Sequence, residues 1–262
     1  MLPFVFFIIL GVPLPLSSLL VLSVDLGTEL GPSMAYVHDP AEKNIMMVPP
    51  RKVLTSQLKA QISQGLQEEK RIFWIKIKSW FRREETGQVL VDNDSLIWCY
   101  LEGGIIETAG CFAAYLIVFV WEGVPLQLLY RSSRKYFLAG APDIILNSGK
   151  MATASDQILI LGKAQAAFYL GIVICQTFNV FVCKHLYEYP YGMDMLRNPY
   201  TVLGVFFGLG IAAIIVYVPW INTVLFSAGP CPPIALLPPI GAGILLFLFE
   251  FVRRFLRKQG IK

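Results

Sequence analysis

Long apolar runs separated by polar stretches dominate this chain. A run of about 20 apolar residues is long enough to cross the hydrocarbon core of a bilayer as an α-helix. Such runs occupy residues 16–37, 96–121, 158–183, 200–221 and 234–252, and a shorter one covers 2–11. The pattern predicts an all-α fold, a polytopic transmembrane helical bundle with five full spans plus a truncated first helix.

The stretch "GVPLPL" separates the first two apolar runs. Because proline has no N–H and interrupts a helix, we expect this stretch to form the turn of a tight helical hairpin. The run before it has about half the length of a crossing. No basic region precedes that run, which disfavours a cleaved signal peptide. We therefore expect the chain to begin inside a membrane helix and to be a fragment of a larger protein.

Basic residues gather in the loops of one side. The loop 38–95 and the tail after residue 252 are rich in Lys and Arg, whereas the loop 122–157 has few and the loop 222–233 has none. Loops rich in Lys and Arg stay in the cytoplasm, so we expect a multi-pass protein with a cytoplasmic C-terminus. The chain is then divided into residues 1–37 with two membrane helices, a basic loop 38–95, and a four-helix membrane bundle 96–262.

The composition supports a membrane protein and excludes some other classes. The chain has 262 residues, of which 55% are hydrophobic and 15% charged, whereas soluble domains have about 25% charged residues. A net charge of +4 gives no reason to expect a nucleic-acid partner, and the expected partner is the lipid bilayer. The segment 70–83 mixes aromatic and basic residues, which fits a headgroup-layer helix, a calmodulin target or a plain juxtamembrane anchor.

Two carboxylates interrupt the apolar segment "VLSVDLGTELGPS". A carboxylate at the bilayer centre costs at least about 2.5 kcal/mol, so such acids mark functional sites. Asp25 and Glu29 are four residues apart and would share one face of a helix. Gly27 and Pro32 weaken the helix there, and freed backbone carbonyls can join the carboxylates as oxygen ligands of a cation. The alternative is an acid pair that only fixes helix packing.

Other polar residues in the apolar runs are candidates for an ion route. Glu107 lies in "GGIIETAG", and Gln176 and Asn179 lie in "VICQTFNVFVCK". With Thr28 they form the predicted ion-route set, although Gln and Asn inside a membrane also serve as interhelical hydrogen-bonding groups. The five cysteines contain no CxxC pair and predict no metal site.

The segment that carries the two acids resembles a known family. "PLPLSSLLVLSVDLGTELGPSMAYVHDPAEKNIMMVPPR" resembles the sixth transmembrane helix of P-type cation-transporting ATPases, in the branch of the sodium/potassium and gastric proton/potassium pumps. The stretch "LEGGIIETAGCFAAY" resembles the seventh helix, "VICQTFNVFVCK" the eighth and "LFEFVRRFLRK" the end of the tenth. The resemblance implies the last six membrane helices of a pump, with the fifth helix cut, and a place in the plasma membrane.

The resemblance also implies roles for single residues. Asp25 matches the first cation-coordinating aspartate of the sixth helix, and Glu29 stands at the second acidic position, usually an aspartate. Asn179 stands where sodium/potassium pumps carry an aspartate of the eighth helix for an additional sodium ion. The ninth helix lacks the paired glutamates of the family. In the outer loop 122–157, "NSGK" stands where the family contacts its beta subunit with a sequence close to SYGQ.

These features leave two functions open. The first is the transport domain of a pump, which supplies ligands for ATP-driven exchange of monovalent cations, sodium/potassium or proton/potassium. The second is a truncated, non-catalytic membrane protein that regulates or associates with a full pump. The sequence contains no DKTGT phosphorylation motif and no nucleotide-binding domain, so we expect no catalytic residue and no cofactor in this chain. By resemblance, Mg²⁺ and ATP belong to the catalytic domains of a full pump.

Overall fold

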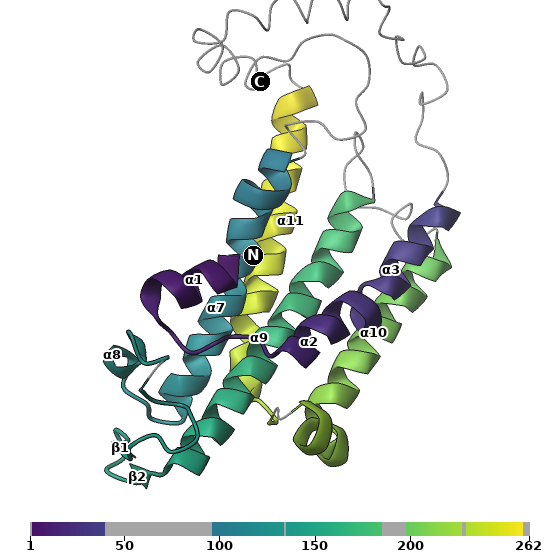
Figure 1. Cartoon of the computed structure of the whole chain (residues 1–262). Coiled ribbons are helices and arrows are strands. Elements are labelled where there is room, and N and C mark those ends of the chain that lie inside the picture. Colours follow the sequence, from purple (N-terminus) through teal and green to yellow (C-terminus); the bar gives the residue numbers. More distant parts are fainter. Residues whose placement is uncertain (1, 40–95, 134, 185–197, 227–228, 259–262) are drawn as a thin grey trace, which may run out of the picture. The chain divides into compact units, whose positions relative to one another are not determined.

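A computed structural model describes residues 2–39, 96–133, 135–184, 198–226 and 229–258 of the chain (Figure 1). The chain divides into two units: Met1–Pro40 with Ile105–Lys262, and Ala41–Gly104. In the second unit the structure describes residues 96–104, which contain a π-helix, η4 (Trp98–Gly103). The basic aromatic segment 70–83 lies outside the described residues, and so does almost all of the predicted loop 38–95.

Helices make up nearly all the described structure of the larger unit. In chain order its elements are α1 (Leu2–Leu10), α2 (Ser18–Ser23), the π-helix η1 (Val24–Thr28), α3 (Leu30–Ala35), the 3₁₀-helix η2 (Tyr36–His38), α7 (Gly104–Trp121), α8 (Leu126–Leu129), β1 (Ile144–Ile145), β2 (Met151–Ala152), α9 (Ala154–Cys183), α10 (Pro199–Tyr217), the π-helix η6 (Ile221–Phe226), the 3₁₀-helix η7 (Pro233–Leu236) and α11 (Leu237–Lys258).

Within the described residues, four helical segments are long and apolar enough to cross a membrane, which confirms the all-α transmembrane bundle. They are Trp98–Trp121, Ala154–Cys183, Pro199–Tyr217 and Pro233–Leu256. The predicted fifth full span, 16–37, is not one continuous helix: it is divided into α2, η1, α3 and η2. Among the described residues, the five predicted spans thus correspond to four continuous helices and one broken helix, whose break falls where Gly27 and Pro32 predicted it.

The helix α9 occupies the centre of the packing. In an apolar 18-residue stretch of its span 61% of the residues are buried, compared with 28% in the corresponding stretch of the span that contains α11. Small residues let α9 and the helices around it approach closely. A side chain at Gly171 of α9 would touch Pro239 of α11, and one at Gly110 of α7 would collide with Ala242 of α11. Close helix approach through small residues is the usual basis of membrane helix packing. Figure 1 shows α9 alongside α11 and α10.

The proline-rich linker between α1 and α2 differs from the tight hairpin that we expected. Residues 11–17 form no helix, and α1 and α2 do not run side by side (Figure 1). Its carbonyl groups instead accept hydrogen bonds from other parts of the chain: Pro13 from the Tyr115 hydroxyl at 2.8 Å and Leu14 from the Gln165 amide at 2.8 Å. Prolines have no N–H, so the linker lacks local donors for its carbonyl groups. Side chains of α7 and α9 supply these donors instead and keep the linker extended.

The outer loop between α7 and α9 contains a small antiparallel hairpin. In it β1 pairs with β2, with Ile145 opposite Met151, and the "NSGK" turn joins the two strands. Gln157 of α9, which is fully buried, makes hydrogen bonds to the loop segment that precedes the hairpin. Its side chain accepts a hydrogen bond from the Phe137 N–H at 3.1 Å and donates one to the Pro142 carbonyl at 2.8 Å.

At the other end of the bundle, polar side chains join the helix termini. Asn198 caps α10 and donates to the Ala35 carbonyl at 2.9 Å and to the Asp39 carboxylate at 2.8 Å. Arg254 of α11 pairs with Glu250 at 2.9 Å and donates to the Val182 carbonyl near the end of α9 at 2.8 Å. These contacts satisfy terminal carbonyls that an α-helix leaves without intrahelical donors.

Candidate cation site on the broken helix

The site begins with the π-helical turn η1, where the sequence reads "VDLGT". The Val24 carbonyl accepts a hydrogen bond from the Glu29 N–H, five residues on, at 3.1 Å, and one from the Thr28 hydroxyl at 2.9 Å. A single π turn adds one residue to the helical path, and such turns are frequent at functional sites. The helix is therefore irregular between the two predicted cation ligands, as Gly27 and Pro32 led us to expect.

Pro32 determines what happens to the next carbonyl groups. Because proline has no N–H, it cannot donate the regular α-helical hydrogen bond to the Thr28 carbonyl. The Glu29 carbonyl, by contrast, accepts from the Ser33 N–H at 3.1 Å and the Ser33 hydroxyl at 2.7 Å. The Thr28 carbonyl thus loses its regular helical donor. Backbone carbonyls of this kind serve as cation ligands in other discontinuous membrane helices.

Glycines of α10 bring that helix against the broken one. A β-carbon at Gly208 would lie 2.9 Å from the Thr28 carbonyl oxygen, and one at Gly204 would lie 2.8 Å from the Gly31 carbonyl carbon and oxygen. Real β-carbons do not approach so closely, so only glycine fits at this distance. The spacing of these two glycines, four residues apart on one helix face, gives the small-residue pattern of close helix pairs.

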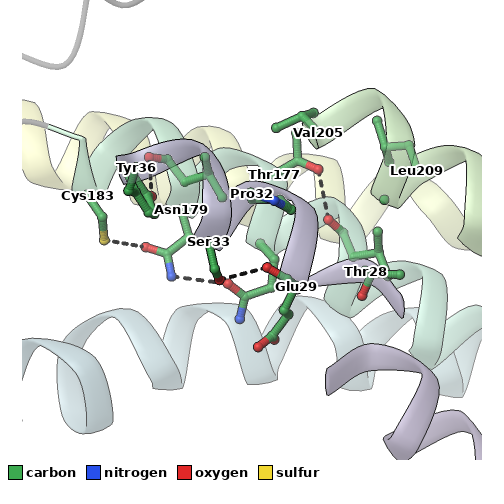
Figure 2. Close-up of a pocket in the computed structure, with 14 residues that line it drawn as sticks. Thr28, Glu29, Pro32, Ser33, Tyr36, Thr177, Asn179, Cys183, Val205 and Leu209 are labelled. Atoms are coloured by element: carbon green, nitrogen blue, oxygen red, sulfur yellow. Dashed lines mark hydrogen bonds between the residues drawn. The ribbon is translucent and has the colours of Figure 1, made fainter. Parts of the chain in front are cut away.

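A pocket of about 230 Å³ lies between the broken helix, α9 and α10. Four of the predicted site residues line it: Thr28, Glu29, Gln176 and Asn179. Figure 2 shows Thr28, Glu29 and Ser33 from the broken helix, with Asn179 and Cys183 from α9. The structure thus brings residues that are about 150 positions apart in the sequence into one polar pocket.

The wall that α9 contributes is a row of neutral polar side chains. The Asn179 amide donates to the Gln176 side-chain oxygen at 3.4 Å, and the Cys183 thiol donates to the Asn179 oxygen at 3.2 Å. Across the pocket, the Tyr36 hydroxyl donates to the Val180 carbonyl at 2.8 Å. Neutral oxygens and one carboxylate face the same space, which is a donor set that suits a hard cation.

Sequence reasoning missed several polar lining residues: Ser33, Tyr36 and Cys183. A helical spacing was available as a signal, because Gln176, Asn179 and Cys183 follow one another at intervals of three and four, the period of one helix face. Ser33 and Tyr36 continue the face of Glu29 in the same way. Gly208 could not be found from the sequence, since its role depends on a neighbouring helix.

Asp25 and Glu107 are near the pocket but do not line it. Asp25 is exposed on the surface of the described chain. Glu29 interacts electrostatically with Asp25 and also with Glu107 of α7. Of the two predicted cation ligands, Glu29 lines the pocket and Asp25 does not, although Asp25 and Glu107 both lie within electrostatic range of Glu29.

Among the described residues, no group of three His, Cys, Asp or Glu side chains is arranged to hold a metal ion. Within the described lining of the pocket, Glu29 is the one carboxylate. The arrangement differs from a divalent-metal centre, where several carboxylates or imidazoles converge. It is a neutral oxygen-rich pocket with one acid inside and two more acids near it.

The family model "Cation transporting ATPase, C-terminus" matches residues 13–65 and 81–256, which is most of the chain and includes every residue of this site. The chain belongs to this family. As a member, it corresponds to the C-terminal membrane region of a P-type cation ATPase, and the resemblance of the sixth-helix motif to P-type pumps is confirmed.

Named relatives agree with the family. The sodium/potassium-transporting ATPase alpha subunit of Tetronarce californica is 24% identical over 259 residues, which cover 98% of this chain and 22% of the relative. The subunits of Hydra vulgaris and Drosophila melanogaster are 24% and 23% identical, again over 98% of this chain and 22% of theirs. The chain thus spans about a fifth of the length of the curated relatives it matches.

Proposed function

We propose that this chain forms the C-terminal transmembrane transport domain of a P-type ATPase and supplies ligands for ATP-driven exchange of monovalent cations, sodium/potassium or proton/potassium, across the plasma membrane. The observation that carries the proposal is the pocket beside a broken helix, with Glu29 next to Thr28, Gln176 and Asn179. Similarity to sodium/potassium-transporting alpha subunits supports the choice of ions.

The charge of the pocket favours a monovalent ion. One carboxylate, that of Glu29, compensates one positive charge, and the hydroxyls and amides around it supply neutral oxygens. A divalent ion would keep an uncompensated charge in a medium of low dielectric constant, which is costly. Asp25, which is exposed and lies within electrostatic range of Glu29, is the second proposed ligand.

In the proposed mechanism the broken helix is the moving part. Phosphorylation in the catalytic part of a full pump, where Mg²⁺ and ATP bind, changes the helix arrangement and opens the site alternately to the two sides. This chain's contribution is to hold the cation and to let α10 slide or tilt against the broken helix at Gly204 and Gly208. Lys and Arg placement supports a cytoplasmic C-terminus.

Binding of labelled sodium or rubidium tests the proposal. The protein is isolated from the membrane of cells that express it, and Glu29→Gln is compared with the unchanged protein. We expect the variant to bind at least one of the two ions roughly tenfold more weakly, since a charged ligand is lost. Asp143→Asn, an exposed acid in the outer loop, serves as the control. Equal binding of both ions by Glu29→Gln would rule the site out.

A beta subunit is a further proposed partner. In the outer hairpin the cross-strand pair Ile145 and Met151 is 65% and 68% exposed, and exposed apolar pairs outside a membrane mark protein contacts. The experiment is co-purification of a beta subunit with the protein and with Ile145→Asp/Met151→Asp. Loss of the subunit from the variant is the expected result, and its retention contradicts the contact.

The second candidate function is a non-catalytic membrane protein that regulates or associates with a full pump. The observation that favours it is the neutral wall of α9, where Asn179 replaces the aspartate that the family resemblance leads one to expect. The size of the native protein separates the two functions. An antibody against "RIFWIKIKSWFRR" should detect a band several times larger than 29.3 kDa if this is part of a pump, and one near that mass if it is not.

A further inference from the structure

Two cysteines face each other between neighbouring helices, away from the pocket. Cys111 of α7 is 2% exposed and Cys175 of α9 is 1% exposed, and both are free thiols. Their side chains interact thiol to thiol. Neither residue belongs to the proposed set of cation ligands, and both lie in the apolar core with their thiols placed together.

The surrounding helices hold the two thiols in place. Gly171 lies one turn before Cys175 on the same face of α9, and a β-carbon there would lie 3.3 Å from the Cys111 sulfur and 3.4 Å from the Cys111 Cα. On the third side, the Cys175 thiol donates to the Pro239 carbonyl of α11 at 3.6 Å. So close an approach of α7 and α9 at this level brings the two thiols together, and a disulfide between them requires β-carbons about 3.5–4.5 Å apart.

Two acidic side chains link the pair electrostatically to the pocket. Glu107 precedes Cys111 by one helical turn and interacts electrostatically with it and with Glu29. Glu29 in turn lines the pocket. The pair is thus buried one helical turn from an acid that is coupled to the candidate site.

We propose that Cys111 and Cys175 are a redox-active dithiol that hydrogen peroxide closes into a disulfide, which cross-links α7 to α9. The Cys111 sulfur attacks one peroxide oxygen, the O–O bond breaks, and a sulfenic acid and water form. The Cys175 sulfur then attacks the sulfenic sulfur, the S–S bond forms, the S–O bond breaks, and a second water leaves. Two thiols lose two electrons and two protons, and one peroxide becomes two waters.

The cross-link would act on the candidate site. Cys175 directly precedes Gln176, one of the lining residues, so the disulfide fixes the α9 wall of the pocket to α7. Alternating access requires helices around the site to move relative to one another. The oxidised form therefore holds the wall in one position, and a reductant releases it.

The test is a mass-spectrometric search for the linked peptides. The intact protein in lipid nanodiscs carries Cys99→Ser, Cys183→Ser and Cys231→Ser, which leaves only the proposed pair, and is treated with hydrogen peroxide before thiols are alkylated. We expect a peptide pair joined through Cys111 and Cys175, lighter by two hydrogens than the sum of the two, that dithiothreitol separates. Alkylation of both cysteines after peroxide treatment would overturn the proposal.

A matched control moves one thiol around the helix. In Cys175→Ala/Ile174→Cys, the second thiol stays at nearly the same depth but turns away by about 100°, so we expect no linked peptide. Linkage of equal yield in this variant would show non-specific oxidation and would also contradict the proposal. Oxidation of Cys111 alone to the sulfinic acid, with Cys175 still alkylated, is a third result that overturns it.

Discussion

Two helix pairs in this protein pack closely through glycines but differ in backbone regularity. One pair is α9 with α11, and the other is the broken helix with α10. In both, glycines let backbones approach: Gly171 against Pro239 in the first pair, Gly204 and Gly208 against Gly31 and Thr28 in the second. The helices of the first pair are continuous, from Ala154 to Cys183 and from Leu237 to Lys258. In the second, a π turn and Pro32 take the regular donor from a carbonyl beside the pocket.

The difference teaches where a membrane protein places its irregular backbone. A backbone group that lacks a partner is costly in lipid, so irregular helix is tolerated only where protein or water covers it. Here the break is covered on one side by α10, and on its other side it faces the polar pocket. A close helix contact in the first pair serves stability, whereas the equally close contact in the second makes a polar break possible.

The largest expected effect comes from separating α10 from the broken helix. Gly204→Ala places a β-carbon 2.8 Å from the backbone of Gly31, and overpacking of this kind costs about 1–3 kcal/mol. We expect a lower unfolding temperature in detergent and weaker cation binding. Gly210→Ala is the control in the same helix, because a β-carbon added there would meet nothing within 4 Å. An equal loss of stability in both variants would show that the close contact does not matter.

Repairing the break is the next test. Pro32→Ala restores an N–H that can donate to the Thr28 carbonyl, so the broken helix should become more regular and the protein more stable. The same change withdraws an oxygen from the pocket, and we expect roughly tenfold weaker cation binding, equivalent to about 1.4 kcal/mol. Thermal unfolding and ion binding are measured on one preparation. A gain in stability with unchanged binding would mean that the carbonyl is not a ligand.

A change at the start of α9 should affect stability only. Thr153 caps this helix, with its hydroxyl and the Asp156 side chain forming a reciprocal pair of capping hydrogen bonds. Thr153→Ala should lower the free energy of unfolding by about 1 kcal/mol. Cation affinity should remain within experimental error, since the cap is far along the chain from Gln176. A marked loss of affinity would mean that the outer end of α9 and the pocket are coupled.

The smallest expected effect is a change of selectivity at Asn179. Asn179→Asp introduces a second carboxylate into the pocket, so affinity for monovalent cations should rise by a few fold, with a larger gain for divalent ions. Asn179→Gln, which stays neutral, is the control. Titration with sodium, potassium and calcium measures the three affinities. Equal affinities in Asn179→Asp and Asn179→Gln would place the ion away from α9.

Much of the fold could be predicted because it depends on local patterns. Four of the predicted spans correspond to continuous helices within a few residues at each end, and the ends follow local signals: Asn198 and Pro199 begin α10, and Pro219 follows its last residue by two positions. The weak helix around Gly27 and Pro32 was predicted for the same reason. The open linker 11–17 was not, because its hydrogen-bond donors come from α7 and α9.

The candidate site was predictable in its residue types but not in its arrangement. Glu29, Thr28, Gln176 and Asn179 were singled out as polar groups in apolar runs, and the structure brings them together. Asp25 was expected beside Glu29 on one face; it is exposed and does not line the pocket. No periodicity along the sequence reveals one extra residue in a helical turn, since that turn is stabilised by contacts with α10.

The sequence by itself determined that this chain is a bundle of membrane helices, which segments span, and where acids interrupt them, because apolar length and helix-breaking residues act locally. Only the tertiary structure decided which helices surround the break, that Gly208 leaves space for the Thr28 carbonyl, and that two thiols meet between α7 and α9. These features depend on the distance between backbones far apart in the sequence, and that distance is set by the packing of the whole bundle.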